Sequence, residues 1–313
     1  MRGCSHSVWL KHKMPNAVSS REPEQPYVGR IAPSPTGLLH AGHAATFWTA
    51  YRRAMTAGGT LLFRNEDLDP HRSRPEFVEA MVEDLLWLGI RWQKPVVTQS
   101  ERLPMYREAI QRLVAAGLVY PCRCSRRDLA RMMHAPHEDP TGARDQEDEP
   151  VYNGHCRDSR ISVAADPLTH NLRFRVPDGE SIAFEDLSAG PQSFTAGRDF
   201  GDFLVWRKPT PGDPEPTGLP SYQLACVVDD AAMGITEVVR GRDLLKSTAR
   251  QILLQRALRL PTPMWFHTPL AVDAEGRRLA KRHDALSLRH LREKGASPAE
   301  VLALVNFETR RQL

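Results

Sequence analysis

The pattern of apolar and polar positions from Tyr27 onward alternates between the period of strands and the period of helices. Over residues 74–90 apolar residues recur every three to four positions, with Pro75 near the start and Gly89 near the end, which predicts an amphipathic helix. Residues 59–69 predict a strand that ends in a carboxylate cluster. Strands and helices that alternate in this way indicate a doubly wound parallel sheet.

The pattern changes in the middle third of the chain. Residues 171–187 predict a hairpin-like pair of strands around a Pro-Asp-Gly turn. From Asp199 the α/β pattern returns, and residues 243–258 predict an amphipathic helix with Asp243 at its N-cap. The middle third is therefore expected to be an insertion within an α/β unit.

The expected fold is a Rossmann-like α/β fold with an inserted α+β subdomain and a short helical C-terminal segment. Residues 1–25 are polar and lack the apolar middle of a secretory signal. Of three interpretations, a transit-like segment, a disordered extension and translated sequence upstream of a start at Met14, the last two are favoured. The expected ranges are an extension at 1–25, a split α/β catalytic domain at 26–120 and 196–285, the insertion at 121–195 and the helical segment at 286–313.

Composition narrows the class of protein only slightly. Charged residues make up 26% and apolar residues 41% of the 313 residues, which is typical of a folded globular chain. The formal charge of +4 permits nucleic-acid binding without indicating it. No apolar run approaches the length of a membrane span. Five cysteines, three of them clustered, favour a reduced compartment and a metal site over a disulfide framework, and hence a cytoplasmic protein.

The most informative stretch is Arg30–His43, which reads RIAPSPTGLLHAGH. A short strand is followed by a turn rich in Pro and Gly, and His40 and His43 then open a predicted helix. Backbone N–H groups and the positive end of a helix dipole converge at such a junction, which suits phosphate. The spacing of three residues lets both imidazole rings contact one ligand.

At these residues the sequence resembles the class I aminoacyl-tRNA synthetases, whose HIGH box reads HAGH here. The flanking RIAPSPTG narrows the resemblance to the glutamyl group. The stretch RRLAKR stands where that family has its KMSKS-type loop, and Lys281 matches the second lysine. Arg278 replaces the first lysine and Ala280 replaces the serine, so a charge is retained and a hydroxyl is lost. Residues 222–251 resemble the family nearly throughout.

The resemblance implies roles for individual side chains. Glu66 is expected to bind the α-amino group of a substrate amino acid, and Arg30 and Arg240 to flank its carboxylates. Two guanidinium groups and one carboxylate would favour a dicarboxylic amino acid over its amide. Asp229 and Asp230 are given a structural role in preference to an ATP ribose contact. The full set is His40, His43 and Lys281 for catalysis, Gly42 with these three for ATP, and Arg30, Ala32, Ser34, Glu66, Tyr222 and Arg240 for glutamate.

Cys122, Cys124 and Cys156 indicate a metal site. Three thiolates need a fourth ligand for tetrahedral zinc. Residue chemistry alone leaves the fourth ligand open between His155 and the pair His134 and His137. Cys226, in an apolar stretch, is interpreted as a buried core residue.

The resembled family points to a different fourth ligand. It has a Cys-x-Cys…Tyr-x-x-x-Cys arrangement in which tyrosine completes the site, and Tyr152 fits that spacing. The resemblance therefore implies one structural Zn²⁺ per chain held by Cys122, Cys124, Tyr152 and Cys156, with His155 as the alternative to Tyr152.

The chain resembles most the truncated paralogues of the glutamyl enzymes, the glutamyl-queuosine tRNA(Asp) synthetases, because few residues follow the lysine motif and no anticodon-binding domain is expected. The resemblance implies activation of L-glutamate by ATP, with Mg²⁺, and transfer to queuosine in the anticodon of tRNA(Asp). The alternatives are a minimal glutamyl-tRNA synthetase that charges the 3′ end of tRNA(Glu), and a catalytically silent zinc-containing RNA-binding paralogue. A monomer without membrane contact is expected, and no general base or Mg²⁺ ligand is nominated.

Overall fold

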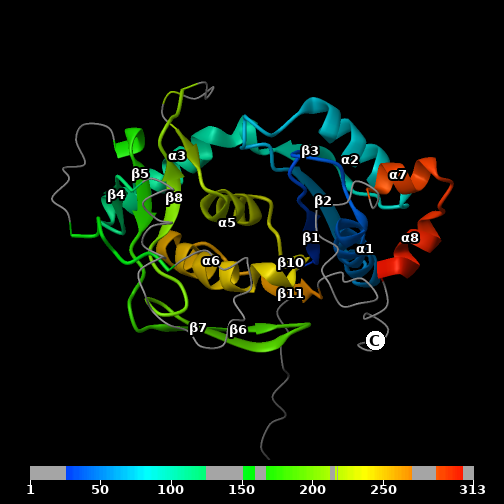
Figure 1. Ribbon diagram of the computed structural model, residues 1–313. Coiled ribbons are helices and arrows are strands. Elements are labelled where there is room, and N and C mark those ends of the chain that lie inside the picture. Colours follow the sequence, from blue (N-terminus) through cyan, green and yellow to red (C-terminus); the bar gives the residue numbers. More distant parts are fainter. Residues whose placement is uncertain are drawn as a thin grey trace, which may run out of the picture.

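A computed structural model describes residues 26–124, 151–158, 167–211, 216, 218–269 and 287–305 (Figure 1). The predicted N-terminal extension lies outside the described residues. So do His134, His137, Arg278, Ala280 and Lys281.

Five parallel strands form the centre of the molecule. They are β1 (Val28–Ile31), β2 (Thr60–Asn65), β3 (Gln93–Thr98), β10 (Glu237–Gly241) and β11 (Met264–Thr268). β1 pairs with β2 and β2 with β3, while β10 pairs with β11, all in parallel. The two groups meet where the N–H of Thr236, just before β10, donates to the carbonyl of Val28 at 2.9 Å. The predicted α/β class with a parallel sheet is confirmed.

The order in which strands are added to the sheet reverses between β1 and β10. From β1 the chain steps outward to β2 and β3 on one side, and it returns to the other side of β1 only at β10. In open α/β sheets, ligands bind at the carboxyl ends of the strands at such a switch point. The ends of β1 and β10 are therefore where a site is expected.

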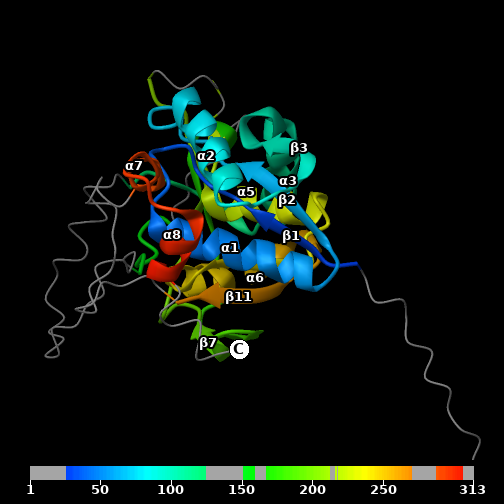
Figure 2. The same cartoon turned by 90° about the vertical axis from the view of Figure 1, so that its right-hand side faces the viewer.

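Helices cover the sheet on both sides (Figures 1 and 2). They are α1 (Ala41–Thr56), α2 (Pro75–Trp87), α3 (Leu103–Ala115), α5 (Tyr222–Ala232), α6 (Leu245–Leu258), α7 (Leu288–Glu293) and α8 (Pro298–Val305). The helix predicted over residues 74–90 is present as α2, with Pro75 as its first residue and Gly89 just past its end at φ +84°. Only glycine adopts that backbone readily, which is why the helix ends there.

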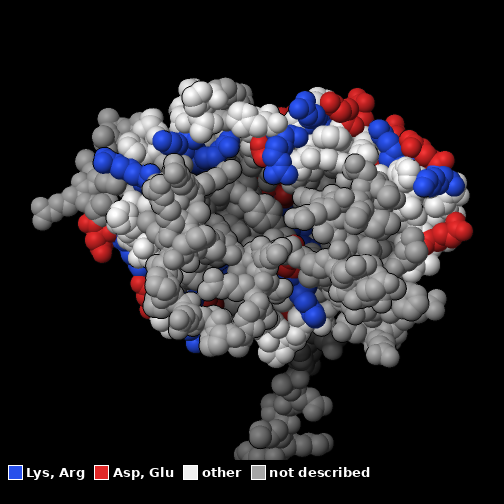
Figure 3. Space-filling view, viewed as in Figure 1, with Lys and Arg blue, Asp and Glu red and all other residues white. Residues whose placement is uncertain are grey.

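The C-terminal helices pack on the first half of the sheet. α8 lies along α1, as both views show (Figures 1 and 2). Glu83 of α2 pairs with Arg292 at 3.2 Å and with Arg289 at 3.7 Å, both on α7. Figure 3 shows acidic and basic side chains side by side over these two helices. Among the described residues, no helix combines the length and the apolar character needed to cross a bilayer.

The middle of the chain forms antiparallel structure at one end of the molecule (Figure 1). One sheet contains β4 (Val119–Cys122), β5 (Asn171–Phe174), β8 (Phe203–Arg207) and β9 (Leu219–Pro220). A separate hairpin, β6 (Ser181–Asp186) and β7 (Gly190–Thr195), joins the edge of β11. The antiparallel sheet reaches Pro220, beyond residue 195, and the predicted domain boundaries stay a prediction.

Two local expectations are wrong. β5 and β6 do not form a hairpin with each other: the N–H of Val176 donates to Asp202, and Pro177 has no N–H, so the ladder stops and the turn carries the chain to another sheet. Asp243 is not the N-cap of α6. It lies in a 3₁₀ turn, Arg242–Leu244, which displaces the start of the helix to Leu245 without a side-chain cap.

Candidate active site

The β1–α1 junction holds two histidines in a reciprocal cap. His40 is the N-cap of α1, and its Nδ1 accepts from the N–H of Gly42 at 3.2 Å, while Nδ1 of His43 accepts from the N–H of His40 at 3.3 Å. The two rings stack with centroids 3.7 Å apart. Because both Nδ1 atoms accept, the proton of each neutral ring lies on Nε2. Both imidazoles are thus prepared as donors at the start of a helix.

Both ends of the segment that contains Lys281 are attached to α1 or its N-cap. Before the segment, the hydroxyl of Thr268 lies 3.0 Å from that of Thr46. After it, Ser287 forms a β-bridge with His40, and the N–H of Leu288 donates to the carbonyl of Leu39 at 2.8 Å. Six residues of extended chain reach at most about 22 Å, so Lys281 is tethered within that distance of Ser287. Its position itself lies outside the described residues.

Arg30 occupies the switch point. It is 4% exposed, its Nε donates to Asp230 at 3.2 Å, and its Nη1 donates to the carbonyl of Val239, the residue before Arg240. Arg30 and Arg240 thus come from adjacent strands, and Arg30 contacts the backbone of the residue before Arg240. Among the described residues, two of the five N–H groups of Arg30 have protein acceptors, and three are left for a ligand.

Glu66 follows β2 and is positioned by Arg64, a residue that the sequence reasoning missed. Arg64 is fully buried and contacts Oε1 of Glu66 at 2.9 Å and Asp230 at 2.5 Å. The thiol of Cys226 also donates to Oε1, at 3.4 Å. Within the described part of the chain Oε2 accepts no hydrogen bond, which leaves it for a ligand's ammonium group. An arginine inside an apolar strand was the signal, because buried charges are paired.

Arg240, on β10, is 5% exposed and tightly held. Its Nε donates to Nε2 of His267 at 3.1 Å, its Nη1 to Gln251 at 2.8 Å, and its Nη2 to Thr248 at 2.7 Å and to the carbonyl of Leu244 at 3.4 Å. Of its five N–H groups, one is therefore left for a ligand among the described residues. Arg240 therefore offers a ligand a single N–H group, whereas Arg30 offers three, on its two terminal nitrogens.

The charges around the switch point do not cancel. Arg30, Arg64 and Arg240 face the carboxylates of Glu66 and Asp230, while Asp229 is taken up by Arg102 at 2.7 Å. Arg240 has no carboxylate partner among the described residues. Burial opposes ionisation of Asp230, but the charges of Arg64 and Arg30 lower the pKa of its carboxyl group, so it is ionised. Among the groups in direct contact here one positive charge is in excess, and the next carboxylate, that of Asp186, is separated from Arg240 by the ring of His267. Arg240 is therefore left to pair directly with a carboxylate of a ligand.

The remaining predicted substrate residues lie around this cluster. Ala32 and Ser34 belong to the turn after β1, and the N–H of Glu66 donates to the carbonyl between them, that of Pro33, at 3.0 Å. Tyr222 is the first residue of α5 and exposes 40% of its surface. A tyrosine hydroxyl is neutral at physiological pH and can donate. Their contacts with a substrate stay a prediction.

Asp229 and Asp230 bind other side chains of the protein, which agrees with the structural role expected from the sequence. Asp229 is fully buried and accepts from Gln99 and Tyr106 as well as from Arg102. Both carboxylates lie in the last turns of α5 rather than at the end of a strand. Cys226 is buried, as expected, but it contacts polar groups instead of an apolar core.

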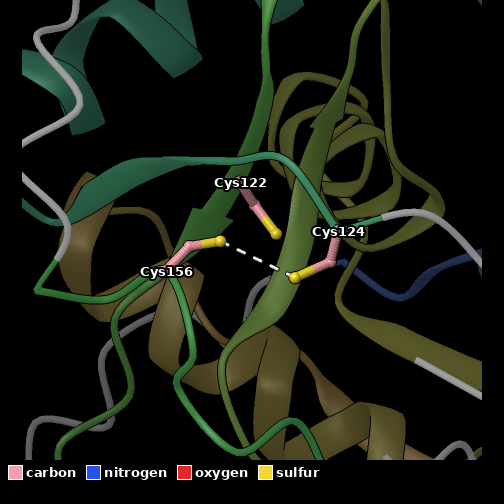
Figure 4. A group of neighbouring side chains, drawn as sticks. All are labelled: Cys122, Cys124 and Cys156. Carbon is pink, nitrogen blue, oxygen red and sulfur yellow. Dashed lines mark hydrogen bonds between the residues drawn. The ribbon is translucent and has the colours of Figure 1, made fainter. Parts of the chain in front are cut away.

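The three clustered cysteines converge at the end of β4 (Figure 4). The sulfurs of Cys122, Cys124 and Cys156 lie within 4.8 Å of one another, and those of Cys124 and Cys156 are 3.6 Å apart. The hydroxyl of Tyr152 is 3.6 Å from the sulfurs of both Cys122 and Cys124. His155 is exposed and is not a member of the described cluster. Tyr152, rather than His155, therefore has the position of a fourth ligand.

These separations fit a tetrahedral ion. With Zn–S bonds of about 2.3 Å and a Zn–O bond of about 2.0 Å, ligand atoms lie about 3.8 Å apart for S···S and about 3.5 Å apart for S···O. The two S···O separations and the separation between the Cys124 and Cys156 sulfurs, each 3.6 Å, are within about 0.2 Å of these values, and the other S···S separations are at most 4.8 Å. Burial raises the pKa of the Cys124 thiol to about 11, so without a cation this thiol is protonated. A bound Zn²⁺ would supply the charge that keeps it as a thiolate.

Arg173 is a second residue that the sequence reasoning missed. On β5, it is 6% exposed, its Nε donates to the sulfur of Cys122 at 3.3 Å, and its guanidinium lies 4.0 Å above the ring of Tyr152. A cation beside several thiolates offsets their negative charge. Its sequence position gave no such signal, because β5 reaches the cluster only through its pairing with β4.

A parallel sheet with helices on both sides, charged side chains at its switch point and a capped helix beside them are the features of a doubly wound α/β fold. Residues 27–312 match the family model "tRNA synthetases class I (E and Q), catalytic domain". The chain therefore belongs to this family of ligases, the class I tRNA synthetases for glutamate and glutamine.

Individual relatives agree with the family. A glutamyl-Q tRNA(Asp) synthetase of Symbiobacterium thermophilum is 47% identical over 286 residues, which cover 88% of this chain and 84% of the relative. One of Rhodobacter capsulatus is 41% identical and covers 90% of this chain and all of the relative. A glutamate tRNA ligase of Elizabethkingia meningosepticum, solved in complex with its amino acid, superposes with a TM-score of 0.66 at 26% identity over 82% of this chain. The chain spans about half the length of that structure, 52%.

Proposed function

We propose that the protein activates L-glutamate with ATP and transfers the glutamyl group to queuosine in the anticodon of tRNA(Asp). The observation that carries the first half is that Arg240, at the switch point, has no carboxylate in direct contact among the described residues and keeps one N–H group for a ligand. Glutamate, with two carboxylates and one ammonium, supplies a negative charge for this contact, whereas glutamine does not. The relatives named as glutamyl-Q tRNA(Asp) synthetases support the second half.

In this proposal the substrate is held from three directions. Arg30 binds one carboxylate with its remaining N–H fork, Arg240 donates a single N–H to the other, and Oε2 of Glu66 accepts from the ammonium group. Ala32, Ser34 and Tyr222 line the same region. Fixed donors of this kind need no reorganisation when the reaction starts.

The first step forms glutamyl-adenylate. An oxygen of the substrate carboxylate attacks the α-phosphorus of ATP in line, and the bond to pyrophosphate breaks. His40 and His43 donate from Nε2, and with the backbone N–H groups around Gly42 they stabilise charge on the phosphoryl oxygens. Lys281 adds an ammonium from its tethered segment. Mg²⁺ would accompany ATP, and no side chain is assigned to it.

The second step transfers the glutamyl group. A hydroxyl of the cyclopentenediol ring of queuosine attacks the activated carbonyl, and AMP leaves. tRNA substrates and a cysteine-based metal site favour the reducing cytoplasm as the compartment of this reaction.

The metal site is proposed to be structural. Cys122, Cys124, Cys156 and Tyr152 would hold Zn²⁺, and Arg173 would offset their charge. When bound, the ion supplies folding free energy rather than chemistry. It would fix the end of β4 against the loop that carries Tyr152.

Two assays separate this function from the alternatives. ATP–pyrophosphate exchange without tRNA should occur with glutamate and not with glutamine or aspartate. A catalytically silent RNA-binding protein would give no exchange. Labelled glutamate should then enter tRNA(Asp) that carries queuosine, and not tRNA(Asp) without queuosine. Label in the terminal adenosine of unmodified tRNA(Glu) would instead identify a minimal glutamyl-tRNA synthetase.

A further inference from the structure

A row of three side chains links the inserted hairpin to Arg240. Asp186, the last residue of β6, contacts Nδ1 of His267 on β11 through its Oδ2 at 2.5 Å. The opposite nitrogen of the same ring, Nε2, lies 3.1 Å from Nε of Arg240 on β10. All three side chains are buried, with exposures of 1%, 0% and 5%. Three strands therefore contribute one hydrogen-bonded chain that ends at the proposed substrate arginine.

The chain fixes the tautomer of His267. Arginine can only donate, so Nε2 of His267 must be the acceptor in this contact. The proton of the neutral ring then lies on Nδ1, where the carboxylate of Asp186 accepts it. The hydroxyl of Thr248, 3.2 Å from Nε2 and 2.7 Å from Nη2 of Arg240, packs against the same pair.

Ionisation is consistent with this arrangement. Burial lowers the pKa of His267, and the charge of Arg240 lowers it further, against the opposing effect of Asp186. Burial opposes ionisation of Asp186, but the hydrogen bonds from His267 and from the N–H of Ala189 lower the pKa of its carboxyl group. At neutral pH the ring is uncharged and the carboxylate is charged.

Asp186 also fixes its own strand end. Its Oδ1 accepts from the N–H groups of Ser188 at 3.0 Å and Ala189 at 2.7 Å, in the turn between β6 and β7. The carboxylate is therefore held by its turn before it reaches His267. Among the described residues only one N–H of Arg240 is left for a ligand, so its direction depends on the plane of the guanidinium group. The Nε contact with His267 fixes one edge of that plane, and the contacts of Nη1 with Gln251 and of Nη2 with Thr248 fix the other.

We propose that His267 and Asp186 are positioning residues for Arg240, and that they set the affinity and selectivity for the amino-acid substrate without touching it. This inference rests on the proposed function, in which Arg240 binds a glutamate carboxylate. The hairpin of the inserted region thereby contributes to substrate selection at a strand end that belongs to the other part of the fold.

Two substitutions of His267 separate positioning from mere support of the hairpin. In His267→Asn the amide NH₂ of the new side chain lies near the position of Nδ1. This variant therefore keeps a donor for Asp186 but offers Arg240 no acceptor. In His267→Gln the carbonyl oxygen of the new side chain lies near the position of Nε2. This variant therefore keeps the acceptor for Arg240 but loses the side-chain contact with Asp186. We expect His267→Asn to raise the KM for glutamate in pyrophosphate exchange by about tenfold or more. His267→Gln should stay within about threefold of the wild type.

The KM for ATP serves as the internal reference and should not change in either variant. A structural role would give the reverse order, with His267→Gln the more damaged variant, and that order would overturn the proposal. Equal KM values for glutamate in both variants and the wild type would overturn it as well. If the wild type itself gave no glutamate-dependent exchange, the proposed function would fail first, and this result is separable because it needs no variant.

Asp186→Asn provides a second test. It leaves His267 in place, so its result does not depend on how well Asn or Gln fits the space of the imidazole ring. Glutamate binding is measured directly by calorimetry, beside Asp202→Asn as the matched control. Asp202 is also buried and its carboxylate also accepts from a backbone N–H, that of Val176, but it contacts Tyr120 instead of the Arg240 chain. We expect weaker glutamate binding only in Asp186→Asn. Equal binding in the two folded variants would contradict the proposal.

Discussion

Replacing Arg240 with Gln removes the one guanidinium group of the switch point, among Arg30, Arg64 and Arg240, that has no described carboxylate in direct contact. In the proposed complex it loses one hydrogen bond to a charged group, worth about 1.5–3 kcal/mol. The KM for glutamate should therefore rise about 10- to 150-fold. The KM for glutamine, which brings no second negative charge, should change far less. The preference for glutamate over glutamine in pyrophosphate exchange is the quantity to measure.

The same substitution also affects stability, because Arg240 donates to buried acceptors on His267, Gln251 and Thr248. Leaving a buried acceptor unpaired costs about 1–3 kcal/mol and three acceptors lose their donor, so the free energy of unfolding should fall by at least about 3 kcal/mol. Arg240→Lys separates the two effects. It keeps the charge but not the planar fork, and it should lose similar stability in urea unfolding. Equal glutamate preference in Arg240→Lys and Arg240→Gln would refute the charge argument.

Three further predictions concern other parts of the fold. Asp84 is fully buried under α7, where desolvation, opposed by Arg292, raises the pKa of its carboxyl group to about 6. Because the raised pKa favours the protonated form, stability should fall as the pH rises from about 4 through 6, and Asp84→Asn should remove this loss in melting curves at pH 5 and pH 8. Tyr152→Phe should bind Zn²⁺ at least about tenfold more weakly, as measured by competition with a chromogenic chelator, while an unchanged affinity would leave the hydroxyl out of the site. Gly218→Ala should lower the melting temperature, because φ is +81° there and a Cβ would meet the carbonyl oxygen of Arg207 at 2.2 Å; an unchanged value would contradict the close approach.

The sequence was most informative where neighbouring residues determine the structure. The β1–α1 junction and α2 could be predicted because a strand, a turn and a helix start follow one another within a short stretch. The hairpin expected at the Pro-Asp-Gly turn failed because strand partners are chosen over long distances. β5 pairs with β4 and β8, and β6 pairs with β7 and with β11, which comes some 80 positions later, as the pair Asp186 and Trp265 shows.

The candidate site shows the same division. Arg30, Glu66 and Arg240 were nominated through a family resemblance, and the structure brings them to adjacent strand ends. Arg64 was missed although a charge inside an apolar strand was a signal, and its partner Asp230 comes from a distant helix. Arg173 was missed because its partner Cys122 lies on a strand far away in the sequence. His267 lies in a stretch with no recognisable motif, and only the pairing of β10 with β11 places it beside Arg240.

The attachment of Thr268 to α1 and of Ser287 to its N-cap, on either side of residues 270–286, has a kinetic consequence for the proposed mechanism. In that mechanism Lys281 does not have to diffuse to the phosphates, because its effective concentration there is set by chain length. For a Gly- and Ser-rich tether that concentration falls roughly as the −3/2 power of length. Doubling the segment with Gly and Ser would therefore slow adenylate formation only about threefold, a gradual dependence that distinguishes tethering from a rigidly built contact.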